Sequence, residues 1–135
     1  QKDPQTMQFN PDYDDVVSEV NGFLMERCVV LEDEGIARDR LAIDPGFGFG
    51  KTVQHNMAML AHFKTFCQHD LPVVAGISRK SSLGSITGRD VEHRMTASVA
   101  AALMAIERGA KIVRVHDVGQ TMDAVKIWSA VQNSL

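Results

Sequence analysis

The order of segments along this chain constrains its fold more than any other feature of the sequence. Apolar residues at helical spacing over 12–35 are followed by a short apolar run at 41–43. The same order then repeats twice, with further predicted strands at 71–77 and 112–115, and further predicted helices at about 54–69, about 91–108 and from 118 to about 132. Strict alternation of strand and helix is typical of βα units on a parallel sheet.

The three apolar runs share a second pattern, because side chains in a strand alternate between two faces. Odd-numbered positions are apolar throughout, namely Leu41, Ile43, Val73, Ala75, Ile77, Val113 and Val115. Even-numbered positions become polar where each run ends, namely at Asp44, Ser78, Lys80, Arg114 and His116. A face that turns polar at every carboxyl end favours a βα barrel over a doubly wound sheet, because a barrel places its chemistry at the C-terminal mouth.

Composition excludes several classes of partner. The formal net charge of −3 provides no basic surface of the kind that nucleic acid or an anionic membrane requires. No apolar run approaches the roughly 18 residues of a membrane span, and residues 1–15 are too polar for a signal peptide. We therefore expect a cytoplasmic protein in which Cys28 and Cys67, both in helical patterns, are buried free thiols.

A glycine-rich loop at 45–52 lies between the first predicted strand and the second predicted helix. It is not a Walker A phosphate loop, because that pattern requires glycine where this chain has Pro45. Its glycines alternate with Phe47 and Phe49, which predicts a tight backbone turn that presents aromatic faces.

Polar side chains at the ends of the predicted strands indicate an electropositive site. Lys80, Arg114 and His116 would converge there, opposed only by Asp44. Such a site suits a phosphate or pyrophosphate group, and the last two βα loops of many barrels bind phosphate. The seven-residue spacing of the histidines on the second predicted helix is too wide for a metal pair; these are His55, His62 and His69.

The chain resembles the C-terminal half of bacterial dihydropteroate synthases in three segments that keep the order and separations of that family. They are DPGFGFGKT at 44–52, GISRKSSLG at 76–84 and RVHDV at 114–118, and DPQTMQ at 3–8 resembles the end of a fourth. The resemblance implies that 1–135 is the C-terminal part of a pterin-binding (β/α)8 TIM-barrel domain, with roughly the last three strands and last four helices. The N-terminal half of such a domain is absent from this chain.

Enzymes of this family are cytosolic transferases of folate biosynthesis and targets of sulfonamide drugs. They condense 6-hydroxymethyl-7,8-dihydropterin pyrophosphate with para-aminobenzoate to 7,8-dihydropteroate and release pyrophosphate. The resemblance implies that Asp44, Lys80 and Arg114 bind the pterin, and that Arg114 and His116 hold the pyrophosphate. Lys80, Arg114 and His116 are the implied catalytic residues, because leaving-group charge develops beside these cations.

The resemblance also assigns the second substrate. It implies that Phe49, Ser78 and Lys80 border the para-aminobenzoate pocket. Gly48 and Gly76 match positions where the backbone approaches the ligand or a neighbouring loop. Mg²⁺ assists the pyrophosphate in this family, although no residue of this chain has a magnesium-ligand pattern.

The assembly of the chain is a further expectation. The family dimerises through its last helices, and residues 97–105, ASVAAALMA, offer a small surface for such a contact or, equally well, for packing against their own sheet. Because three strands cannot close a barrel, we expect the 135-residue chain alone to be inactive. Two other functions stay open: a methyltetrahydrofolate-using methyltransferase on a pterin-binding barrel, and a non-catalytic half-barrel that serves as a binding or assembly module.

Overall fold

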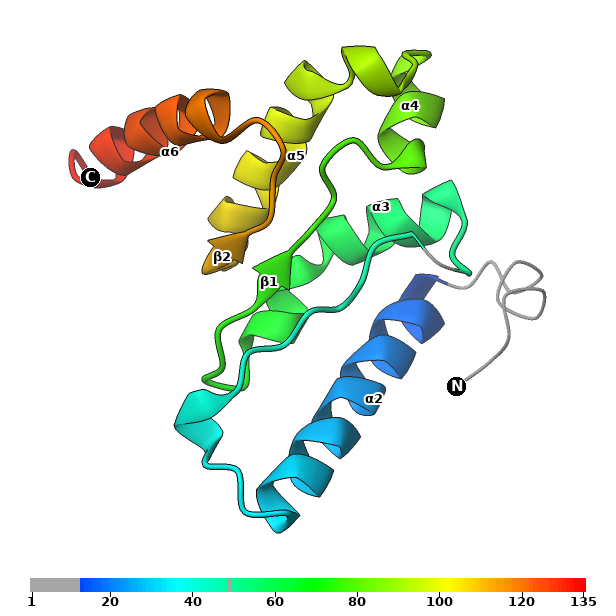
Figure 1. Cartoon of the computed structure of the whole chain (residues 1–135), viewed down its shortest axis with the longest axis vertical. Coiled ribbons are helices and arrows are strands. Elements are labelled where there is room, and N and C mark those ends of the chain that lie inside the picture. The colour runs from blue at the N-terminus through cyan, green and yellow to red at the C-terminus, as the bar shows by residue number, and fades with distance from the viewer. Residues whose placement is uncertain (1–12, 49) are drawn as a thin grey trace.

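The computed structural model of the protein describes residues 13–48 and 50–135 (Figure 1). Residues 3–8 and Phe49, which carry two of the sequence-based expectations, lie outside the described residues. The first predicted helix is confirmed as α2 (Tyr13–Asp33). It is followed by Gly35, whose φ of 95° is left-handed, and a short 3-10 helix, η1 (Arg38–Arg40), leads into the first apolar run.

The prediction of one continuous helix at about 54–69 is wrong, because this segment forms two helical pieces. α3 (Val53–Ala61) begins where the Thr52 hydroxyl accepts the His55 backbone N–H at 3.0 Å, and η2 (Phe63–Cys67) follows as a 3-10 helix. Side chains three residues apart in a 3-10 helix point the same way. Phe63 and Phe66 are both completely buried.

A helix that the apolar spacing does not predict, α4 (Ser81–Thr87), forms in the serine- and glycine-rich connection after the second apolar run. Burial of Ser82, Leu83 and Gly84 holds this short helix in place, and it ends at Gly88, which has a φ of 74°. The third predicted helix begins with a 3-10 turn, η3 (Val91–His93), and continues as α5 (Met95–Glu107). The last predicted helix is confirmed as α6 (Val118–Gln132), which packs against α5 (Figure 1).

The three apolar runs pair in parallel, as predicted, although the regular strands are shorter than their apolar stretches. β1 (Val74–Ala75) pairs with β2 (Ile112–Val113), with Val74 opposite Ile112. Ile43 joins the other side of this sheet through a single parallel bridge to Val73. Among the described residues, the first and third apolar runs each pair only with the second run, which lies between them. Fewer backbone hydrogen bonds therefore hold these two outer runs in a regular strand.

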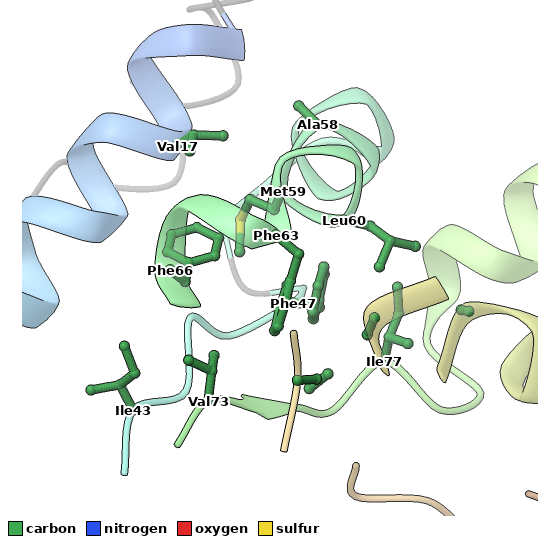
Figure 2. Packing of buried hydrophobic residues seen from close by; sticks show 14 of the residues in the cluster. Val17, Ile43, Phe47, Ala58, Met59, Leu60, Phe63, Phe66, Val73 and Ile77 are labelled. Atoms are coloured by element: carbon green, nitrogen blue, oxygen red, sulfur yellow. The ribbon is translucent and has the colours of Figure 1, made fainter. Parts of the chain in front are cut away.

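The core lies between the odd-numbered face of these runs and the helices (Figure 2). Ile43, Val73 and Ile77 are buried against aromatic side chains of the loop and of η2. Phe47 stacks on Phe63 with 6.2 Å between ring centroids, and the ring of Phe63 meets that of Phe66 edge-on. The prediction that the glycine-rich loop presents aromatic faces is therefore wrong for Phe47, because its ring fills the core.

The two cysteines are free thiols, as predicted, but only one of them is fully buried. Cys28 is enclosed by the core, whereas Cys67 is half-buried at the end of η2, beside Gly109. None of the helices that the structure describes is both long enough and apolar enough to cross a membrane.

Candidate active site

The register of β1 and β2 places the residues after each strand side by side. Ala75 lies opposite Val113, and the Arg114 backbone N–H donates to the Ala75 carbonyl at 3.0 Å, so the next pair is Gly76 and Arg114. The guanidinium of Arg114 lies directly on Gly76, because a Cβ at that position would be 2.1 Å from Nη2. Any other residue at position 76 would push this side chain aside. A cavity of about 130 Å³ opens here, lined by Gly76, Ser78, Lys80, Arg114, Val115 and His116.

An ion pair joins the first and third runs across this site. The Arg114 Nη1 donates to the Asp44 Oδ2 at 2.9 Å, and the other carboxylate oxygen accepts the Gly46 backbone N–H at 2.9 Å. The Arg114 side chain is 61% exposed and that of Asp44 is 34% exposed. Water screens a pair this open, so it contributes little to stability and serves chiefly to orient both groups.

A second cross-connection joins the ends of β1 and β2. The hydroxyl of Ser78, which is buried, lies 2.8 Å from the His116 Nδ1, and it also accepts the His116 backbone N–H at 3.3 Å. The imidazole is thereby held at the edge of the cavity, beside Arg114. Its side chain is exposed, so that its remaining ring nitrogen can meet a ligand.

Two lysines complete the charge of the site. Lys80 donates from Nζ to the Phe47 carbonyl at 2.6 Å. Burial lowers the pKa of Lys80 below its ordinary value and the nearby Arg114 lowers it further, while Asp44 raises it. Burial and Lys80 likewise lower the pKa of Lys51, again opposed by Asp44. Three cations around one carboxylate make the site electropositive, as the sequence predicts.

Lys51 is a site residue that sequence reasoning missed. It follows the glycine-rich loop directly, and its backbone N–H closes a turn onto the Gly48 carbonyl at 2.9 Å. The signal in the sequence is a lysine directly after a glycine-rich loop, which places a cation beside the loop even though the Walker A pattern is absent.

The glycine-rich loop is held by the buried side-chain amide of Asn56, which lies on the apolar face of α3. The Asn56 Oδ1 accepts the Gly48 N–H at 3.0 Å, and its Nδ2 donates to the Ser82 hydroxyl at 2.8 Å. Both side chains are buried. Asn56 therefore ties the loop to the start of α4, directly after Lys80. An asparagine in an otherwise apolar stripe was the available signal, because a buried amide requires partners.

The structure thus brings together Asp44, Ser78, Lys80, Arg114 and His116 at one end of the parallel runs, with Gly48 and Gly76 between them. Phe49, the remaining predicted site residue, lies outside the described residues.

Comparison with known proteins agrees with this geometry. A family model described as pterin binding enzyme matches residues 1–116. The chain belongs to the pterin-binding enzyme family. Within this family it is 47% identical to the dihydropteroate synthase of Haemophilus influenzae over 99% of this chain and 49% of that relative. The chain therefore spans about half the length of the curated relatives it matches.

Solved structures extend the comparison to the fold. The Xanthomonas albilineans dihydropteroate synthase in complex with 7,8-dihydropteroate superposes with a TM-score of 0.87 at 54% identity, over 90% of this chain and 47% of that one. The same enzyme with 4-aminobenzoic acid gives a TM-score of 0.86 at 52% identity, over 90% and 46%. The chain therefore has the fold of part of a (β/α)8 TIM barrel.

Proposed function

We propose that residues 1–135 are the C-terminal part of a dihydropteroate synthase barrel. The reaction is the condensation of 6-hydroxymethyl-7,8-dihydropterin pyrophosphate with para-aminobenzoate to 7,8-dihydropteroate and pyrophosphate. One observation carries the proposal, namely the convergence of Asp44, Lys80, Arg114 and His116 at the carboxyl ends of parallel runs. It is supported by 54% identity to a synthase whose structure holds 7,8-dihydropteroate.

The pterin pyrophosphate occupies the Asp44 side of this site in the proposed reaction. The Asp44 carboxylate accepts hydrogen bonds from the pterin ring, and the Arg114 guanidinium, already beside it at 2.9 Å, lies against the ring and reaches the pyrophosphate. The bond between the pterin methylene carbon and the pyrophosphate oxygen breaks, and its electron pair leaves with the pyrophosphate. Arg114 and His116 stabilise this charge more in the transition state than in the ground state.

Para-aminobenzoate attacks from the Ser78 and Lys80 side. Its amine nitrogen forms the new bond to the methylene carbon and then loses a proton. The Ser78 hydroxyl, the Lys80 ammonium and Phe49 border its pocket in this proposal. Sulfonamides, which are analogues of this substrate, would compete at the same place.

Mg²⁺ does not fit the residues described for this chain. Within residues 13–48 and 50–135, no three His, Cys, Asp or Glu side chains lie close enough to hold a metal ion. The Asp44 carboxylate already accepts from Arg114 and from the Gly46 N–H, whereas Mg²⁺ requires several oxygen ligands. Mg²⁺ therefore enters the proposal only as an ion that accompanies the pyrophosphate, and no step depends on it.

Assembly and location complete the proposal. We place the protein in the cytoplasm and its homodimer contact on α5 and α6, where apolar side chains are exposed: Met104, Met122, Ile127 and Val131. Three of the small residues of 97–105, namely Ala101, Ala102 and Ala105, are instead buried within this chain.

The proposed activity is tested by supplying the missing half of the barrel. We expect this chain, joined to the N-terminal half of the Haemophilus influenzae relative, to form 7,8-dihydropteroate in a chromatographic assay. We expect the 135-residue chain alone to form none, because only part of the barrel is present. Product from the chain alone would refute the second expectation.

Two controls separate the proposed activity from the other functions. Sulfonamides should inhibit the joined protein, which they would not do to a methyltetrahydrofolate-using methyltransferase. Calorimetric titration of the joined protein with the pterin pyrophosphate should show binding, whereas a purely structural half-barrel would bind nothing. A folded joined protein that neither binds this substrate nor forms product would contradict the proposal.

A further inference from the structure

The short segment 78–80 sends its three side chains to two different places. Ser78 and Lys80 line the cavity, whereas Arg79 does not. Arg79 has a φ of 56°, in the left-handed region that non-glycine residues rarely adopt. Such a conformation is strained and persists only where the surroundings hold it.

The Arg79 side chain is held by a two-point ion pair to the next strand end. Its Nη2 donates to the Asp117 Oδ1 at 2.7 Å and its Nε to the Oδ2 at 3.3 Å. The Asp117 side chain is only 15% exposed, so solvent screens this pair less than an open surface pair. Next to it, Ser78 contacts His116, so that consecutive residues of one loop are cross-linked to consecutive residues of the other.

The Arg79 backbone is held at both of its polar atoms. Its N–H donates to the Ser98 hydroxyl at 2.8 Å, and its carbonyl accepts from the Arg94 Nη1 at 3.0 Å. The Arg94 guanidinium reaches this carbonyl across Gly84, where a Cβ would lie 2.4 Å from its Nη2. The backbone of Arg79 is thus anchored at the start of α5 by two hydrogen bonds, one to Ser98 within the helix and one from its N-cap residue, Arg94.

We propose that Arg79, through its ion pair with Asp117, is a positioning residue that sets the separation between two ligand-binding segments. One segment carries Ser78 and Lys80, and the other carries Arg114 and His116. The pair touches no substrate in this proposal, which rests on the proposed function. Without it, the left-handed turn relaxes, and the hydroxyl and ammonium of one segment lose their alignment with the guanidinium and imidazole of the other.

The test uses the opposite charges of the two partners. Binding of inorganic pyrophosphate to the 135-residue chain is measured by calorimetry for the unchanged chain, Arg79→Ala and Asp117→Asn. Arg79→Ala removes a positive charge and Asp117→Asn removes a negative one, so electrostatics alone predicts weaker and tighter binding, respectively. Positioning predicts that both variants bind about tenfold more weakly, because misplaced contacts lose affinity whichever partner is removed. Glu32→Gln, which breaks the exposed pair between Glu32 of α2 and Arg38 of η1, is the matched control and should bind unchanged.

The outcomes separate this inference from the proposed function. If the unchanged chain does not bind pyrophosphate, the same comparison is made in the protein joined to an N-terminal half. A folded joined protein that does not bind pyrophosphate argues against the proposed function itself. An unchanged chain that binds, with Asp117→Asn binding equally or more tightly, overturns the positioning role. Circular dichroism melting checks that each variant is folded. If Arg79→Ala does not fold, Arg79→Lys takes its place, because it keeps the charge but loses the two-point contact. Positioning then predicts weaker binding, whereas electrostatics alone predicts unchanged binding.

Discussion

The contact between Arg114 and Gly76 shows how much of the site depends on a missing side chain. The guanidinium occupies the volume in which a Cβ at position 76 would lie, and from there it reaches Asp44. Chemistry at this site therefore depends on a residue that itself carries no functional group.

Gly76→Ala is expected to weaken pyrophosphate binding by about tenfold, because the new Cβ, 2.1 Å from the Arg114 Nη2, forces the guanidinium off Asp44. Stability should change little, since the displaced group is the exposed end of a flexible side chain. Calorimetric titration and thermal melting measure the two effects. Unchanged affinity would mean that Arg114 does not need this position.

At the residue scale, strand parity was sufficient to predict which charged side chains share a face. It could not predict the part played by Asn56 or the conformation of Arg79. Asn56 lies at a position where the helical spacing predicts a core-facing residue. Its side chain nevertheless acts through hydrogen bonds to two distant segments. Arg79 lies between two predicted site residues, and its left-handed φ and its ion pair with Asp117 become visible only in the structure.

At the element scale, long periodic helices were predictable and short ones were not. α2 and α6 carry enough apolar periodicity to be predicted from the chain alone. α4 consists of serines and a glycine that local propensity assigns to a turn, and it exists because its neighbours bury Leu83. The break after α3, where η2 follows as a 3-10 helix, is likewise invisible in the apolar spacing, because side chains three residues apart share a face in either kind of helix.

Two glycines near β2 give a prediction at this scale. Gly109 lies before β2, and Gly119 lies in the first turn of α6. Gly109 ends α5 with a φ of 114°, and a Cβ there would lie 3.0 Å from the Cys67 side chain. Gly109→Ala is therefore expected to lower the free energy of unfolding by about 1–3 kcal/mol. Gly119→Ala is the matched control, because Gly119 is helical and open, and alanine should raise this free energy by about 0.5–1 kcal/mol. Urea unfolding measures both, and equal effects would contradict the role of backbone strain.

At the scale of the whole molecule, the even-numbered face of the sheet is open. Ile112 is 46% exposed at the start of β2, where the proposed barrel would have its packed interior. Ile77, on the odd-numbered face, is 2% exposed. The two isoleucines therefore differ in what covers them within this chain.

Ile112→Ala should cost less than about 1 kcal/mol of unfolding free energy in the 135-residue chain. In the protein joined to an N-terminal half, the same change should cost about 2–5 kcal/mol, because the side chain becomes buried. Ile77→Ala should be costly in both proteins. A small cost for Ile112→Ala in a folded joined protein would mean that the added half does not cover this face.

The division of each run between a stabilising face and a ligand-binding face also determines which genetic changes this region tolerates. A substitution at one position alters either the core or the site, since neighbouring residues serve different faces. Deleting one residue within 73–78 would instead rotate every later side chain of that run to the opposite face. Apolar side chains would then line the cavity, and charged side chains would enter the core. Sequences that keep this fold are therefore expected to vary within 73–78 by substitution and not by insertion or deletion.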